Sequence, residues 1–216
     1  MGGFTLTEAL VVMGILAVLV AVLVPGLARA KGLAHAVTCR NHLRHWGIAT
    51  QLYADGHEDR LPPEGVPNPT DRHTNTGWYV QLPAEVGWRR YVDEPWRTNA
   101  AAEPGRTWWL CPANRRRSNG RNLFHYCLNQ QVDGTSEADE PTRLGSLLNP
   151  TTLVWLFDSK NLPAVGYWGF VHTNGHRGGA QILFLDGHTG WFSNRDYWDF
   201  EIQRGRTNHP AIRWFP

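Results

Sequence analysis

The residues best suited to metal binding lie in the last third of the chain. His176 is followed by nine residues and then by Asp186-Gly187, and Asp158 lies upstream of both. Carboxylate oxygens are ligands that Ca2+ prefers, so one hypothesis is a calcium site that includes Asp158 and Asp186. The alternative needs no ligand, because Asp-Gly makes a tight turn between two strands and His176 can bond to the Asp186 carboxylate or to the backbone.

Histidine spacing gives less support for a zinc site or for catalysis. His172 and His176 are four residues apart, as two ligands on one helix face would be, but Asn174-Gly175 between them is typical of a turn. His188 is a third candidate ligand, and no Glu follows in an HExxH pattern. The sequence also contains no nucleophile elbow, Walker loop or Rossmann fingerprint. We therefore expect a protein that is not an enzyme and has no certain cofactor.

The overall composition excludes several classes of protein. Of 216 residues, 42% are hydrophobic and 19% are charged, which excludes a disordered tail, and a net charge of +2 gives little support for a dedicated nucleic-acid binder. The densest basic run is Arg115-Arg116-Arg117 with Arg121, and only Phe124 is an aromatic neighbour. We interpret this run as a solvated loop that faces an acidic subunit surface or a polysaccharide. Nothing else in the sequence supports a nucleic acid or a polysaccharide as a partner.

One segment is far more apolar than the rest. Between Phe4 and Leu27, 18 of 24 residues are hydrophobic, and Glu8 is the only charge. As a helix this segment would be about 36 Å long, enough to cross a bilayer core of about 30 Å. Pro25-Gly26 should weaken or kink it. Three explanations compete: a cleaved signal peptide with a site at Ala28-Arg29-Ala30, a single-span anchor, or a filament-forming helix.

The helical pattern continues beyond the apolar segment, which argues against a signal peptide. We predict one helix from residue 4 to about 54, with an apolar part (4–27) and an amphipathic part (28–55). One side of the amphipathic part carries residues at alternating three- and four-residue spacings, namely Ala36, Cys39, Leu43, Trp46, Thr50 and Tyr53.

The remaining residues, 56–216, predict a β-rich head. Leu153–Phe157 is typical of a strand, and Ala180–Leu185 and His188–Phe192 flank Asp186-Gly187 as a hairpin would. Trp78–Leu82 and Leu123–Leu128 are weaker candidates for strands. The predicted fold is α+β, with an antiparallel sheet packed on the second half of the long helix.

The N-terminus, Gly3-Phe4-Thr-Leu-Thr-Glu8 followed by an apolar helix and Pro25, resembles that of type IV pilins and type II secretion pseudopilins. The resemblance implies that residues 1–3 are a leader, that a prepilin peptidase cuts after Gly3 and that the new N-terminal Phe4 is methylated. Glu8 would then pair with the amine of Phe4 on a neighbouring subunit. A lone carboxylate in a bilayer segment costs a few kcal/mol, in keeping with a need for such a partner.

Two features of the ends of the apolar segment do not fit the usual pattern. The leader, Met1-Gly2-Gly3, carries no Lys or Arg, whereas Arg29 and Lys31 follow the span. The positive-inside rule alone would therefore place the head in the cytoplasm. Either the true start lies upstream of Met1 or the leader has been trimmed.

The spacing from His176 to Asp186-Gly187 resembles the H-x9-DG signature of a large pilin-like family, also called the DUF1559 family. Supporting marks occur in order along the chain, at Cys39–Leu43 with Tyr53–Asp55, Trp109–Pro112, Tyr126 with Asn129, and Pro150–Asp158. The resemblance implies architecture and location more than activity.

The cysteines alone leave the disulfide pairing open. Cys39, Cys111 and Cys127 allow three pairings, each of which leaves one thiol over, and three buried thiols are the alternative. The family marks include Cys39 and Cys111 but not Cys127. The resemblance therefore implies a Cys39–Cys111 disulfide, worth about 2–4 kcal/mol in an oxidising compartment.

Together these features predict a structural subunit of a type IV pilus-like or pseudopilus-like filament. Its precursor would be a single-pass inner-membrane protein, and the assembled form would be extracellular. The partners would be copies of the same chain, the prepilin peptidase and the assembly machinery. The alternative is a membrane-anchored extracytoplasmic module that binds a ligand or a metal and never polymerises.

Overall fold

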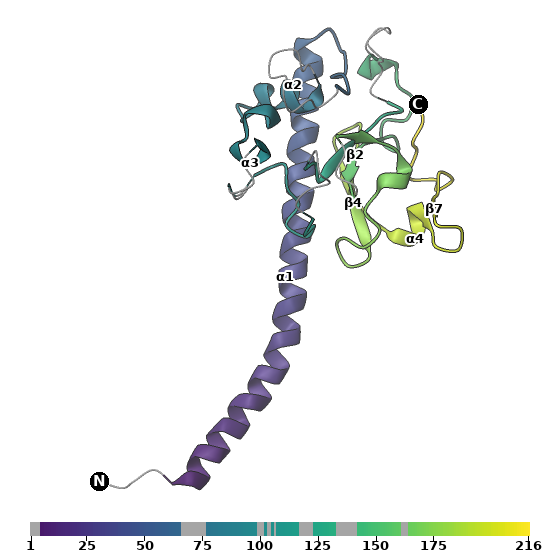
Figure 1. Ribbon diagram of the computed structural model, residues 1–216. Coiled ribbons are helices and arrows are strands. Elements are labelled where there is room, and N and C mark those ends of the chain that lie inside the picture. The colour runs from purple at the N-terminus through teal and green to yellow at the C-terminus, as the bar shows by residue number, and fades with distance from the viewer. Residues whose placement is uncertain are drawn as a thin grey trace.

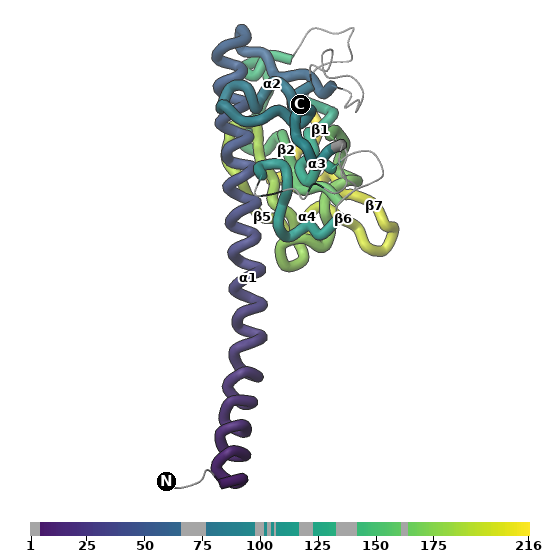
Figure 2. The backbone as a smooth tube through the Cα atoms, turned by 60° about the vertical axis from the view of Figure 1, so that its left-hand side comes forward, coloured from purple at the N-terminus to yellow at the C-terminus, as the bar shows by residue number. Residues whose placement is uncertain are grey.

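A long helix carries a sheet-containing head at its C-terminal end (Figure 1). The computed structural model describes residues 5–65, 77–98, 102, 105, 107–116, 123–132, 142–160 and 164–216. Helix α1 spans Leu6–Gly56, which confirms the predicted continuous helix. Its 51 residues give a length of about 76 Å. Figure 2 shows that the N-terminal half of α1 projects away from the head.

Helix α1 continues through Pro25 without interruption. Proline lacks an N–H group, so the carbonyl four residues earlier, at Ala21, loses its helical donor. The N-terminal half of α1 curves gently in Figure 1. The predicted weak point is thus tolerated within one helix.

The predicted core-facing side of α1 is confirmed from Cys39 onward, and Ala36 is half-buried at its start. Trp155 Nε1 donates a 2.8 Å hydrogen bond to Thr50 Oγ1, so this stripe includes one polar contact with the sheet. The buried residues of α1 are Cys39, Leu43, Trp46, Gly47, Ala49, Thr50, Tyr53 and Ala54.

The main sheet has five strands in the order β3-β1-β2-β4-β5. Strand pairs β1–β2, β2–β4 and β4–β5 are antiparallel, as predicted, and β4 and β5 form the predicted hairpin. The strands are β1 (Tyr126–Asn129), β2 (Val154–Asp158), β3 (Val165–Gly166), β4 (Gly179–Phe184) and β5 (Thr189–Ser193).

The prediction of a purely antiparallel sheet was wrong, because β3 pairs parallel to β1. Asp158 at the end of β2 lies opposite Tyr126 at the start of β1. The chain therefore returns to the other edge of β1 from that same end, and β3 must run in the same direction as β1. The sheet is mixed and the fold is α+β.

The strand predicted for Trp78–Leu82 was also wrong, because this segment begins helix α2 (Trp78–Glu85). Trp78, Tyr79, Leu82 and Pro83 are buried. These positions fall on one face of a helix, a spacing that a strand would split between two faces.

Short elements complete the head. Figures 1 and 2 place α2 beside the C-terminal part of α1, and α4 and β7 on the far side of the sheet from α1. Besides α2, the short elements of the head are η1 (Tyr91–Asp93), α3 (Pro95–Thr98), η2 (Leu144–Ser146), η3 (Trp168–Phe170), α4 (Asn194–Tyr197), β6 (Trp198–Asp199) and β7 (Arg204–Gly205).

Both faces of the sheet are buried. Leu156 and Leu183 pack with the aromatic residues of α1 and α2 in one core, whereas Phe157 and Ile182 pack with Trp214 of the C-terminal segment in the other. A strand covered on both faces has a nearly continuous apolar sequence. This burial explains why β2 and β4 are mostly apolar, with Asp158 and Gln181 as the polar exceptions.

Candidate functional site

The N-terminal half of α1 is an exposed apolar surface. Between Leu6 and Leu27, 14 large hydrophobic side chains are exposed, with fractions such as 79% for Leu6 and 70% for Val22. By length and composition α1 can cross a membrane. Exposing this surface to water would cost on the order of 20–40 kcal/mol, since each large apolar side chain gains about 1.5–3 kcal/mol on burial. Lipid or protein must therefore cover it.

Glu8 lies in the first turn of α1 and closes a capping box with Thr5. The Thr5 backbone N–H donates to Glu8 Oε2 at 2.8 Å, and the Glu8 backbone N–H donates to Thr5 Oγ1 at 3.3 Å. The carboxylate is thus held at the N-terminal end of the helix, where the helix dipole favours negative charge. Gly3 and Phe4, the predicted processing residues, lie outside the described residues.

Asp186-Gly187 forms the predicted turn between β4 and β5. The Gly187 N–H donates to the Phe184 carbonyl at 3.0 Å, and Gly187 has a φ of +86°, a conformation that favours glycine. Asp186 Oδ1 lies 2.6 Å from His188 Nδ1. Gln51 of α1 donates to the Leu185 carbonyl at 3.3 Å, so the turn also docks on the long helix.

His176 does not reach the turn, which corrects the expectation that it bonds to Asp186 or to the backbone. Its Nε2 lies 2.9 Å from Asp158 Oδ2, and both side chains are buried. The Gln181 backbone N–H also donates to Asp158 Oδ2, at 2.8 Å. His176 precedes β4, whereas Asp186 follows it.

A tight turn before β4 directs the His176 side chain inward. His176 and Arg177 have positive φ values of 41° and 67°, and Gly178 has a φ of 84°. The N–H groups of Gly178 and Gly179 both donate to the Gly175 carbonyl, at 2.9 and 2.8 Å. Non-glycine residues seldom adopt this conformation, so the turn depends on the contacts that His176 makes.

The disulfide between Cys39 and Cys111 is present and joins α1 to the head. Cys111 Sγ lies 3.2 Å from His176 Nε2, so the disulfide and the His176–Asp158 pair form one buried cluster. Cys127 is a free buried thiol on strand β1, and burial raises its pKa well above the ordinary value. A protonated, buried thiol is a poor nucleophile, so Cys127 is suited to packing rather than to exchange.

Asp158 and Asp186 cannot share a calcium ion in this fold. Asp158 accepts from Gln181 near the start of β4, and Asp186 lies beyond the other end, with the strand from Gln181 to Leu185 alone spanning about 13 Å. Among the described residues, Cys39, Cys111 and His176 lie close enough to share a metal ion. The disulfide occupies both of those sulfurs, so only His176 of this group keeps a ligand atom.

His172 lies near this cluster, and burial lowers the pKa of its imidazole. Its Nδ1 accepts from the Asn174 backbone N–H at 3.1 Å, and Asn174-Gly175 is not helical, as predicted. His188 lies at the other end of β4, with Asp186. The three histidines considered as zinc ligands therefore do not converge.

The basic run is only partly described. Arg115 and Arg116 are exposed, and Arg116 Nη1 donates to the Lys160 carbonyl at 3.1 Å. Arg117 and Arg121 lie outside the described residues.

Comparison of the chain with protein-family models, curated proteins and solved structures finds no match. The resemblance to pilins therefore rests on the residues named in the sequence analysis.

Three features of the site escaped the sequence reasoning. Thr5 and Glu8 fit the S/T-x-x-E capping pattern, a signal that could have revealed the capping box. Gly47 lies on the buried side of α1, where a helix glycine indicates close approach of another segment. No local sequence pattern predicts the pairing of His176 with Asp158, because the two residues are 18 positions apart.

Proposed function

We propose that this protein is a structural subunit of a type IV pilus-like or pseudopilus-like filament. The observation that carries the proposal is the division of α1. Its N-terminal half is apolar and exposed on all sides, and its C-terminal half is bound to the head through the disulfide and the core. A helix of this kind can serve as a membrane anchor in the precursor and as a core element in a helical polymer.

In the proposed filament, the apolar halves of neighbouring α1 helices pack together and the heads form the outer surface. The prepilin peptidase cuts after Gly3, and methylated Phe4 becomes the N-terminus. Glu8 pairs with the Phe4 amine of the next subunit and sets the register of assembly. The capping box supports this role because it holds the exposed Glu8 carboxylate at the N-terminal end of the helix.

The first test is direct. Intact-mass measurement and N-terminal sequencing of the native protein are expected to show a methylated Phe4 terminus, and electron microscopy of material sheared from cells is expected to show filaments that contain this chain. A terminus beyond Ala30, or a chain found only as isolated spans in lipid, would overturn the proposal.

The Glu8 charge can be separated from its capping role by two substitutions. Gln at this position preserves a capping box, so Glu8→Gln removes the charge and keeps the cap, whereas Thr5→Ala removes the cap and keeps the charge. We expect Glu8→Gln to abolish filaments and Thr5→Ala to reduce them only modestly. Equal effects would show that Glu8 only caps the helix. Glu58→Gln, on the exposed surface after α1, is the matched control.

A membrane-anchored module that binds a ligand and never polymerises is the second candidate, favoured by a pocket in the head lined by tryptophans, Arg89 and Glu94. This second candidate function requires only that α1 can span a bilayer. The same microscopy separates the two candidates, because such a module would stay in the membrane fraction and form no filament under any growth condition.

A further inference from the structure

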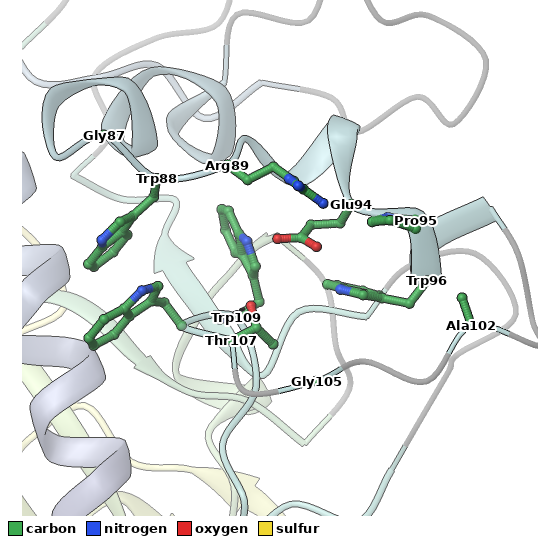
Figure 3. A pocket seen from close by; sticks show the side chains of 11 residues that line it. Gly87, Trp88, Arg89, Glu94, Pro95, Trp96, Ala102, Gly105, Thr107 and Trp109 are labelled. Atoms are coloured by element: carbon green, nitrogen blue, oxygen red, sulfur yellow. Dashed lines mark hydrogen bonds between the residues drawn. The ribbon is translucent and has the colours of Figure 1, made fainter.

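The head contains a pocket of about 510 Å3 that lies away from the His176 cluster (Figure 3). Its wall comes from the segment after α2, from the segment around α3, and from residues 107–109. This volume lies within the range of about 300–1,000 Å3 that is typical of small-molecule sites.

Four tryptophans line the pocket, and other aromatic side chains of the head pack against them. Trp88 stacks on Trp108 with ring centroids 4.4 Å apart, and His45 of α1 contacts Trp108 edge-on at 4.5 Å. Trp109 is buried against Tyr91, and Trp96 meets the edge of the same Tyr91 at 5.6 Å. Trp96 remains half-buried at the pocket. The rings are therefore preorganised rather than loosely exposed.

Two opposite charges face the same space. Figure 3 shows the Arg89 guanidinium and the Glu94 carboxylate directed toward each other, with the indoles of Trp96 and Trp109 on either side of Glu94. Glu94 is half-buried and Arg89 is exposed at the rim. Burial raises the pKa of Glu94, and the opposing influences are the Arg89 charge and a hydrogen bond from Trp96.

These charges select among ligand classes. A cation would suit the indoles and Glu94 but would meet the Arg89 charge, and an anion would meet Glu94. A purely apolar molecule would bury both charged groups without new partners, which is costly. A neutral sugar ring avoids each penalty, because its hydroxyls donate to the carboxylate and accept from the guanidinium while its C–H face packs on an indole.

We propose that this pocket binds a neutral pyranose, stacked on Trp96 and hydrogen-bonded through its hydroxyls to Glu94 and Arg89. The site is confined to the head, so the proposal goes beyond the filament function and does not depend on it. On an assembled filament, a pocket repeated along the polymer would bind a polysaccharide with high avidity.

The test uses the purified full chain in detergent on an array of neutral hexose oligosaccharides, sialylated glycans, glucosamine oligomers and phosphocholine. Titration of the best binder, followed by tryptophan fluorescence and by saturation-transfer NMR, gives the affinity. We expect binding of neutral glycans, weakened about tenfold or more by Trp96→Ala and by Glu94→Gln. The matched controls are Trp191→Ala, at an exposed indole on β5, and Glu85→Gln, at a half-buried carboxylate on α2.

Circular dichroism separates lost binding from lost folding, and Trp96→Phe replaces Trp96→Ala if the latter unfolds. Three outcomes would overturn the proposal: no neutral glycan binds, only the acidic or cationic probes bind, or folded Trp96 and Glu94 variants bind as well as the wild type. None of these outcomes bears on filament formation, which is measured separately by microscopy.

Discussion

Gly47 in α1 and Gly187 in the β4–β5 turn lie so close that a Cβ placed on Gly47 would be 3.3 Å from the Gly187 Cα. The same Cβ would be 3.0 Å from Leu183 Cδ1. Eight residues earlier in α1, or about 12 Å along the helix, Cys39 is bonded to Cys111, which contacts His176. One end of the H-x9-DG motif, at Gly187, packs on α1, and the other end, at His176, contacts the disulfide that joins Cys111 to α1. Both ends of β4 are therefore held against α1.

A larger side chain at position 47 should separate the hairpin from the helix. Gly47→Val is expected to destabilise the head by about 1–3 kcal/mol, because neither the turn backbone nor Leu183 can move without loss of packing. Gly32→Val is the matched control, since it makes the same change in α1 where no atom lies within 4 Å. Thermal unfolding followed by near-UV circular dichroism measures both, and equal melting temperatures would show that the contact does not matter.

The disulfide should account for a measurable part of the stability of the head. Opening the Cys39–Cys111 link, which closes a sequence separation of 72 residues, is expected to cost about 2–4 kcal/mol. A reductant should therefore lower the melting temperature of the wild type and leave that of the Cys39→Ser/Cys111→Ser variant unchanged. Thiol titration of the denatured chain should give one reactive thiol before reduction and three after it. Three thiols before reduction would contradict the pairing.

Regular periodicity made part of this fold predictable from the sequence. The Cys39-to-Tyr53 stripe and the Asp186-Gly187 hairpin depend on local patterns, and both are confirmed. Trp78–Leu82 was misassigned because a short apolar run fits a strand and a helix equally well. The parallel pairing of β3 depends on the path of the whole chain, which no local pattern encodes.

The site was harder to predict than the fold. His176 was singled out from the sequence, but its partner was predicted wrongly. The pairing with Asp158 requires positive φ values at His176 and Arg177, which intrinsic preferences disfavour. The carboxylate nearest in the motif, Asp186, pairs with His188 instead.

The His176–Asp158 pair should matter for stability far more than the Asp186–His188 pair. His176→Ala removes one of the two partners of the buried Asp158 Oδ2, and Asp158→Asn removes the charge that faces the buried His176, so each should cost roughly 3–5 kcal/mol. Asp186→Asn, the same change at an exposed pair, should cost less than about 1 kcal/mol.

A double-mutant cycle by denaturant unfolding tests whether His176 and Asp158 act together. The double variant should be less destabilised than the sum of the single variants, with a coupling of about 0.5–3 kcal/mol. Strict additivity would mean that the 2.9 Å contact between His176 Nε2 and Asp158 Oδ2 carries no energy.

His42 makes the stability of the head depend on pH. Burial is the main reason that the pKa of His42 falls from its ordinary value of 6.5 to about 4, with a smaller contribution from His45 and an opposing one from Asp158. His42 Nδ1 and the Tyr126 hydroxyl are hydrogen-bonded, 2.9 Å apart. Burial raises the pKa of Tyr126 well above its ordinary value, so its hydroxyl stays protonated.

The sign of this dependence follows from proton binding. Between pH 6.5 and about 4 the unfolded chain binds a proton at His42 that the folded head does not. The contribution of His42 to stability is therefore complete above pH 6.5, falls as the pH falls through this window and levels off below it. Its upper limit is roughly 3 kcal/mol. His42→Gln should flatten the curve of unfolding free energy against pH in this window, and His35→Gln, at a half-buried position of α1, is the matched control. An unchanged slope in the His42 variant would place the acid sensitivity elsewhere in the head.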